Sequence, residues 1–216
     1  MKEKVFEFGF GDQKLKLALP EEQVIEVIEG RAFPPVTDVA AAVREALANP
    51  IGTPPLKEVV KRGDKVGIVV SDITRAWVKF NLFLPVLLDE LNACGIPDKD
   101  MFVVIALGAH RAHTPEENVL VCGEDVCRRV PVYQHDCHNQ EELAYVGKTS
   151  RGVETYINKR LHDADKMILT GGIVYHFMAG FGGGRKAVMP GISGFKTIQG
   201  NHLFCMNKEV GKGLNP

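Results

Sequence analysis

Three short and almost wholly apolar segments constrain the fold of this chain more than any other feature. They are residues 65–70, 101–107 and 166–170. An unbroken apolar run of this length is typical of a strand that is buried on both faces. Segments with helical character lie between them, most clearly residues 80–93, which end before a glycine and a proline. Strands that alternate with helices predict an α/β fold: a Rossmann-like open, mostly parallel sheet with flanking helices.

Capping and turn signals add further elements to this prediction. Asp38 is a helix N-cap before residues 39–48, and Thr114 followed by Pro115 and two glutamates opens another helix. Short helices are expected at 56–61 and 161–165. Two hairpins are expected, one joining 143–148 to 154–158 and one joining 4–8 to 14–18 as a small N-terminal β element.

Composition excludes several classes of protein. The 216 residues are 45% hydrophobic and 25% charged, which suits a packed globular domain rather than a disordered chain. A net charge of -1 argues against bulk attraction to nucleic acid or to an anionic membrane. Apolar runs are far shorter than a membrane span requires, and the N-terminus lacks the apolar core of a signal peptide. Five cysteines without a C-x-x-C pair favour a reducing compartment, so we expect a cytoplasmic protein.

Polar residues follow each of the three predicted strands. Residues 71–75 read Ser-Asp-Ile-Thr-Arg, residues 108–113 read Gly-Ala-His-Arg-Ala-His, and a long glycine-rich segment follows residue 170. Ligands of open α/β sheets bind outside the carboxyl ends of the strands. We therefore expect an acid, arginines, a lysine and histidines to meet at one edge of the sheet.

Each candidate also has an ordinary structural interpretation. Asp72 and Arg75 would equally suit a helix cap and an exposed arginine, and His110, His176 and His202, each taken alone, are more often structural. His113, just before a helix cap, is interpreted as structural.

The segment 180–186 is not a Walker loop, because Ala187 replaces the required hydroxyl residue. Its three consecutive glycines before Arg185 and Lys186 are best explained by close approach of the backbone to a bulky ligand, with a flexible surface loop as the alternative. The run 135–138, His-Asp-Cys-His, resembles a metal site only superficially. Adjacent residues of an extended segment point to opposite faces, so we interpret it as structural.

Taken together, the motifs Gly108–His110–Arg111, Gly183-Gly184-Arg185-Lys186 with the following Pro-Gly, and Asn201-His202 resemble the N-terminal domain of the nickel-pincer-dependent lactate racemase family. The similarity covers nearly all of residues 1–216 and includes the 71–75 segment and the Thr-Ser-Arg-Gly turn at 149–152. It implies a cofactor-binding domain of a cytoplasmic isomerase.

The resemblance implies a role for particular residues. Lys186 stands where the family carries a covalently attached nickel-pincer nucleotide, pyridinium-3,5-bisthiocarboxylic acid mononucleotide. His202 matches the histidine that completes the nickel coordination, and His110 and His176 match the catalytic acid and base. The cofactor-binding residues that it implies are Lys186, Asp72, Arg75, Gly183 and Gly184.

The implied reaction is the interconversion of stereoisomers of lactate or a related 2-hydroxy acid by reversible hydride transfer. Direct deprotonation at carbon would need a base far stronger than histidine, whereas removal of hydride with loss of the hydroxyl proton has a lower barrier. The cofactor then accepts the hydride, and two histidines allow either enantiomer to lose its hydroxyl proton.

Family members carry a second, C-terminal domain that contributes to the active-site cleft, and we expect it to be absent from this chain. Either the chain is an excised domain, which we favour, or it is a short form that works with a partner subunit. An alternative function is a non-catalytic cofactor- or nucleotide-binding module, inactive without the second domain. A phosphate-binding domain unrelated to nickel is a third hypothesis. The expected partner is a small 2-hydroxy acid, and an exposed cleft face would favour self-association into a homo-oligomer.

Overall fold

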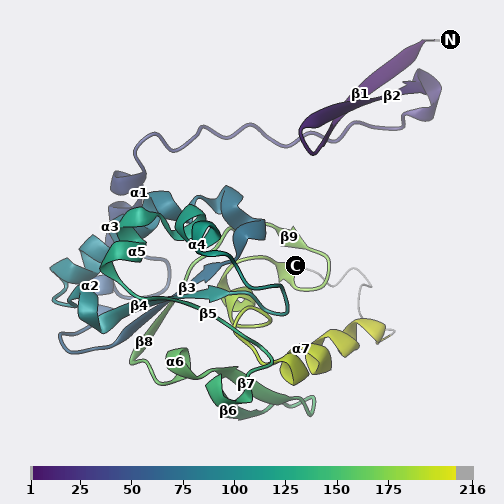
Figure 1. Ribbon diagram of the computed structural model, residues 1–216. Helices are drawn as coiled ribbons and strands as arrows, with labels where there is room; N and C mark the ends of the chain where they lie inside the picture. Colours follow the sequence, from purple (N-terminus) through teal and green to yellow (C-terminus); the bar gives the residue numbers. More distant parts are fainter. Residues whose placement is uncertain (1, 208–216) are drawn as a thin grey trace. The chain divides into compact units, whose positions relative to one another are not determined.

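The computed structural model describes residues 2–207, and the chain divides between Thr37 and Asp38 into two compact units (Figure 1). The smaller unit is the predicted N-terminal β element. Strands β1 (Glu3–Phe10) and β2 (Gln13–Pro20) pair antiparallel around a turn at Gly11, whose φ of 59° suits glycine, and the 3-10 helix η1 (Glu21–Gln23) follows.

The larger unit is built on a parallel sheet of four strands within its described residues. The strand order is β5 (Val132–Gln134), β4 (Met101–Ala106), β3 (Val66–Ser71) and β8 (Lys166–Leu169). All three pairings are parallel, so the carboxyl ends of the strands lie at one edge. The predicted α/β class and mostly parallel sheet are confirmed.

Both faces of the sheet are covered, which explains why β3 and β4 are almost continuously apolar. Alternate residues of each strand enter different cores: Ile68 and Val103 enter one, and Val69 and Val104 enter the other. Figure 1 shows α1, α3, α4 and α5 on the first face, with α6, α7 and the β6–β7 hairpin on the second. The helices of the first face are α1 (Val39–Ala48), α2 (Leu56–Val59), α3 (Phe80–Ala93), α4 (Pro115–Cys122) and α5 (Glu124–Arg129).

The remaining elements connect the sheet to its second face and to the segment after β8. Strands β6 (Leu143–Lys148) and β7 (Glu154–Asn158) form the second predicted hairpin, and α6 (Lys159–His162) follows it. The segment after β8 holds the short strands β9 (Tyr175–His176) and β10 (Gly180–Phe181), and then α7 (Phe195–His202). Short 3-10 helices complete the list: η2 (Ile73–Val78), η3 (Asp98–Asp100), η4 (Gln140–Glu142), η5 (Gly184–Ala187) and η6 (Leu203–Met206).

The helix caps predicted from sequence are present. Asp38 accepts a hydrogen bond from the amide of Ala41 at 2.9 Å, and Thr114 forms a reciprocal capping box with Glu117. The third predicted strand differs from expectation in its burial. All four residues of β8 are only half-buried, because β8 lies at the edge of the sheet and pairs with β3 alone.

The histidines at 113 and 135, which are interpreted as structural from the sequence, are both buried. His135 is buried, with its Nε2 at 3.0 Å from the Ser193 carbonyl and its Nδ1 at 3.3 Å from Asn158. His113 is buried, and each of the five cysteines, all of which lie in the described range, is a free thiol. No helix within residues 2–207 combines the length and apolar character needed to cross a membrane.

We expect Leu84→Ala to lower the free energy of unfolding by about 2–5 kcal/mol, because Leu84 of α3 is fully buried in the first core. Leu82→Ala is the matched control on the same helix, since Leu82 is 52% exposed and should change stability by less than about 0.5 kcal/mol. Urea denaturation of both variants measures the difference. Equal losses would contradict the assignment of the buried face of α3.

Candidate functional site

The segments that follow β3, β4 and β8 meet around one cavity of about 190 Å³. The first segment enters η2, the second precedes α4, and the third runs through β9, β10 and η5 to α7. This is the edge at which the sequence predicts a ligand site. The predicted site residues that line the cavity are Asp72, Arg75, His110, His176, Gly183, Lys186 and His202.

Gly184 is the one predicted site residue outside this lining. Its φ of 48° is in the left-handed region, and a Cβ built there would meet nothing within 4 Å. Backbone conformation therefore accounts for glycine at this position, at the start of η5.

Asp72 and His110 form the most clearly built contact of the site. The Asp72 side chain is 5% exposed and contacts His110 Nδ1 through Oδ2, while the Thr74 hydroxyl donates to Oδ1 at 2.5 Å. A carboxylate accepts, so the proton of neutral His110 lies on Nδ1 and the lone pair on Nε2. The His110 side chain is 58% exposed, which leaves Nε2 accessible as a proton acceptor.

His176 has the opposite arrangement. The backbone amides of Met178 and Ala179 both donate to its Nδ1 at 3.2 Å, so the proton of neutral His176 lies on Nε2. Burial lowers the pKa of His176, and the neighbouring charges of Lys186, Arg75 and His202 lower it further. Of the three histidines that line the cavity, His110 and His176 therefore differ: His110 offers an acceptor, and His176 offers a donor.

Lys186 and Arg75 make the cavity cationic. Burial lowers the pKa of Lys186 because it disfavours the ammonium form, and the charge of Arg75 adds to that effect. Arg75 Nη1 donates to Thr74 Oγ1 at 2.9 Å, which links the guanidinium to the Asp72 turn. An amine with a lowered pKa is a better nucleophile near neutral pH, and the cations suit an anionic ligand.

Glycines let the segment after β8 cross itself closely. A Cβ at Gly183 would lie 3.0 Å from the Gly172 carbonyl oxygen, and one at Gly172 would lie 2.6 Å from the ring of Trp77. The sequence predicts that the glycine run admits a bulky ligand. Gly183 does line the cavity, but its missing side chain also makes room for the backbone of Gly172.

The cavity also contains residues that sequence reasoning missed. Trp77 and Val174 contribute apolar wall. Pro190 and Gly191, which belong to the family motif identified from the sequence, lie opposite the end of β4, where the Gly108 amide donates to the Gly191 carbonyl at 2.8 Å. The single tryptophan of the chain, six residues after the end of β3, was the available signal.

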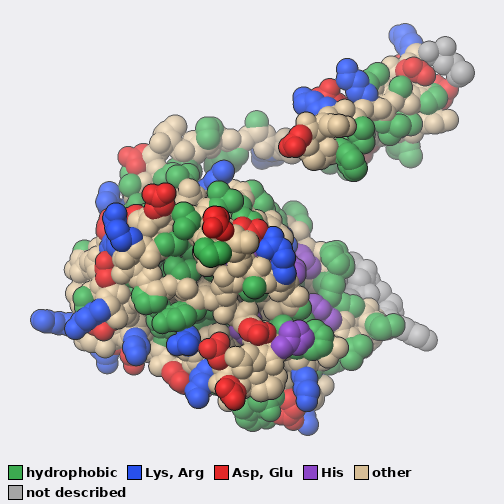
Figure 2. Space-filling model, viewed as in Figure 1, with side chains coloured by type: hydrophobic (Ala, Val, Ile, Leu, Met, Phe, Trp, Pro, Cys, Tyr) green, Lys and Arg blue, Asp and Glu red, His purple; other side chains and the backbone are tan. Residues whose placement is uncertain are grey.

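His202 is at the end of α7 and is exposed. Within residues 2–207 no group of three or more His, Cys, Asp or Glu side chains is arranged to hold a metal ion. In Figure 2 histidine side chains reach the surface of the larger unit near β9 and near α7.

Comparison with known proteins identifies the family of the chain. Residues 10–213 match the family described as "Lactate racemase N-terminal domain". The chain belongs to this family. It is 34% identical over 212 residues to a lactate racemase of Thermoanaerobacterium thermosaccharolyticum, covering 96% of this chain and 49% of that protein. It is 38% identical over 160 residues to a lactate racemase of Lactiplantibacillus plantarum, covering 74% of this chain and 37% of that protein.

Solved structures support the same family. The lactate racemase apoprotein from Thermoanaerobacterium thermosaccharolyticum superposes with a TM-score of 0.82 at 33% identity, covering 96% of this chain and 48% of that one. A Thermotoga maritima protein superposes with a TM-score of 0.60 at 26% identity, covering 82% and 44%. The chain thus spans about half the length of the lactate racemases that it matches.

We expect the amine of Lys186 in this lactate racemase family domain to react at lower pH than an ordinary lysine. Competitive acetylation across a pH series, read by peptide mass spectrometry, gives its titration midpoint. Arg75→Gln should raise that midpoint, because removal of a like charge favours the ammonium form. Arg111→Gln, which alters an arginine outside the cavity lining, is the control. An unchanged midpoint in Arg75→Gln would exclude the influence of Arg75.

Proposed function

We propose that this chain is the cofactor-holding part of a racemase or epimerase that acts on lactate or a related 2-hydroxycarboxylate. The observation that carries the proposal is that His110, His176, Lys186 and His202 all line one cavity in a chain of the lactate racemase family. An ordinary α/β scaffold has no structural need for three histidines and a partly buried lysine at one strand edge.

The residues present fit a nickel-pincer nucleotide, and we propose that Lys186 tethers it and His202 binds its nickel. A metal that already has sulfur and carbon donors from an organic ligand needs few ligands from the protein, and His202 offers one imidazole at the cavity. Arg75 supplies charge for a phosphate or a carboxylate, and the depressed pKa of Lys186 suits covalent attachment. When bound, the cofactor would supply a reversible hydride acceptor.

In this proposal His110 takes the hydroxyl proton of one enantiomer at Nε2. The contact with Asp72 through Nδ1 fixes the orientation of the ring and stabilises the imidazolium that forms. Asp72 is buried and in direct contact with His110, so its charge acts at close range on the ring.

His176 serves the opposite enantiomer. With Nδ1 held by two backbone amides, its Nε2–H is available to donate to an oxygen of the substrate. To accept a proton at Nε2, the ring must first move its own proton to Nδ1, which requires that the amides of Met178 and Ala179 release it. Proton transfer to His176 therefore requires a change of tautomer, whereas proton transfer to His110 does not.

We further propose that the second half of the relatives' length contributes substrate contacts, and that the protein works in the cytoplasm. Free thiols throughout the chain support a reducing compartment. His110 is more than half exposed at the cavity. Without further protein around it, the site would orient substrate poorly and admit water, so this chain alone should hold the cofactor and turn over slowly.

We expect exposure to the nickel-pincer nucleotide to add one nucleotide-sized mass to this chain, accompanied by bound nickel. The expected attachment is to the partly buried amine of Lys186, so Lys186→Ala should abolish the adduct. Lys196→Ala, an exposed lysine on α7, is the matched control and should leave it intact. Intact-mass spectrometry and metal analysis read both quantities. An adduct that persists in Lys186→Ala would contradict the assignment of Lys186 as the attachment residue.

Substitution of the histidines separates catalysis from binding. In a complete protein that includes the second half, His110→Ala or His176→Ala should lower turnover by about 10²–10⁴-fold, because a proton acceptor or donor is lost. Bound nickel should stay unchanged in both variants. If the His110 and His176 variants keep their turnover, and only Lys186 or His202 variants lose bound cofactor, the result favours the alternative, a non-catalytic cofactor-binding module. His162→Ala, outside the cavity lining, is the control.

A further inference from the structure

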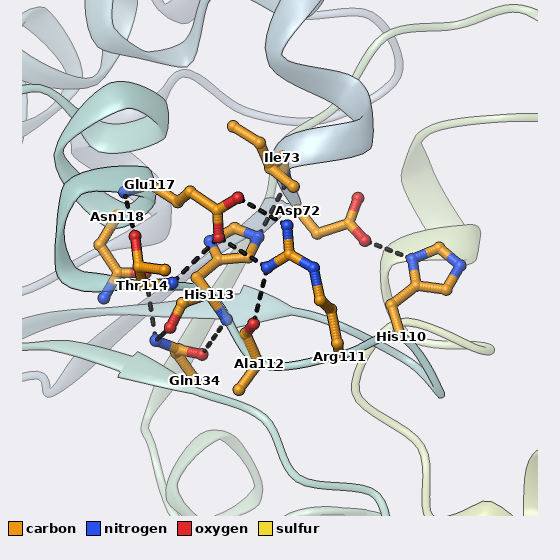
Figure 3. A network of polar contacts seen from close by, with 10 residues as sticks. All are labelled: Asp72, Ile73, His110, Arg111, Ala112, His113, Thr114, Glu117, Asn118 and Gln134. Carbon is orange, nitrogen blue, oxygen red and sulfur yellow. Dashed lines mark hydrogen bonds and ion pairs between the residues drawn. The ribbon is translucent and has the colours of Figure 1, made fainter.

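The backbone of the turn that carries Asp72 and Arg75 is bound by a side chain from another segment of the chain. Figure 3 shows His113, from the segment between β4 and α4, directed toward Ile73. The Ile73 amide donates to His113 Nε2 at 2.9 Å. His110 contacts Asp72 in the same segment, so residues 110–113 join the turn at two successive positions, once through Asp72 and once through Ile73.

This second contact changes what the Asp72 carboxylate can do. Asp72 is the N-cap of η2, and an aspartate at that position ordinarily accepts an N–H from the first helical turn. Here its carboxylate caps no amide of η2, and the first amide of that helix is satisfied by His113 instead. Both carboxylate oxygens are therefore available to other side chains, one to Thr74 and one to His110.

His113 is itself fixed in place. Its amide donates to Gln134 Oε1 at 2.8 Å, and Gln134 Nε2 donates to the His113 carbonyl at 3.2 Å and to Asn118 Oδ1 at 3.3 Å. Gln134 ends β5, so the histidine is tied to the edge of the sheet (Figure 3). The capping box of Thr114 with Glu117 holds the next residue.

The other ring nitrogen of His113 argues against a purely space-filling role. Because Nε2 accepts, the proton of the neutral ring lies on Nδ1, which is buried and has no hydrogen-bond partner within residues 2–207. An unpaired buried donor is destabilising, and an apolar side chain would not leave one. The favourable polar contact of the ring is the one to Ile73.

We infer that His113 is a positioning residue, which holds the 72–75 turn through the Ile73 amide and thereby keeps the Asp72 carboxylate on His110. The inference rests on the proposed function for its catalytic meaning. The dependence of the His110 proton position on His113 holds whether or not the proposed function is correct. Without the acceptor, the partly buried amide of Ile73 must find another partner, and the turn that carries Asp72 moves.

The test measures the proton position on the His110 ring by long-range ¹H–¹⁵N NMR of this chain without cofactor. The wild-type chain should have the Nδ1–H form of His110, and Asp72→Ala gives the reference for the lost contact. His113→Leu and His113→Asn should shift His110 to the Nε2–H form that Asp72→Ala gives, since leucine has no acceptor and asparagine is too short to reach. In glutamine, Oε1 is as many bonds from Cα as Nε2 is in histidine, so His113→Gln should retain the Nδ1–H form.

His162→Leu, which removes an exposed histidine, is the matched control and should leave His110 unchanged. If His113→Leu does not fold, the test is the difference in the His110 proton position between His113→Gln and His113→Asn. Retention of the Nδ1–H form in folded His113→Asn or His113→Leu would overturn the inference, as would its loss in His113→Gln. Failure of His113→Gln to fold would also overturn it, because the residue would then serve the fold as a whole. Since no cofactor is present, this result is independent of whether an adduct forms on Lys186.

Discussion

Strands β3 and β4 pair in parallel over six residues, and alternate side chains from both enter two separate cores. This double burial determines much of the larger unit. The burial requires cover on both faces, by helices on one and by the β6–β7 hairpin with α6 and α7 on the other. The parallel pairing places the carboxyl ends of both strands at the same edge. The side chains after those ends, Asp72 and His110, come into contact although they are 38 residues apart in sequence. The site follows from the burial of two strands.

Charge is distributed unevenly around that edge. Lys186 and Arg75 line the cavity as cations, while the acid of the lining, Asp72, is buried and engaged by His110 and Thr74. A ligand therefore meets positive charge without a free competing carboxylate, which favours an anion. Burial depresses the pKa of His176 and the same charges depress it further, so its neutral form is favoured beside a cationic lysine. The ring of His176 is held at Nδ1 by backbone amides, and that of His110 is held at Nδ1 by a carboxylate, so the two rings present different hydrogen-bonding groups to a ligand.

Much of this fold could be predicted from the sequence, because its signals are local. The apolar runs predicted β3 and β4, and the Thr114 capping box predicted the start of α4. Strand β5 was not predicted, since three residues are too few for a periodic pattern, and the half-buried state of β8 depends on strand order, which no local pattern encodes.

For the site, the sequence predicted which residues would gather but not how they contact one another. The strand-end rule and the family resemblance together selected the residues that line the cavity. The contacts among them were not predictable: the Asp72–His110 pair, the bond from Ile73 to His113 and the packing of Trp77 on Gly172 all join segments distant in sequence.

The packing of Trp77 against Gly172 limits how this cavity can diverge. Even the Cβ of an alanine at 172 would lie 2.6 Å from the indole ring, so a side chain at that position requires Trp77 to move. A smaller residue at 77 would remove the obstacle and at the same time open the apolar wall. Position 77 can therefore change alone, whereas a side chain at 172 depends on the residue at 77, so a reshaping of the cavity by this route takes two substitutions in order, first at 77 and then at 172.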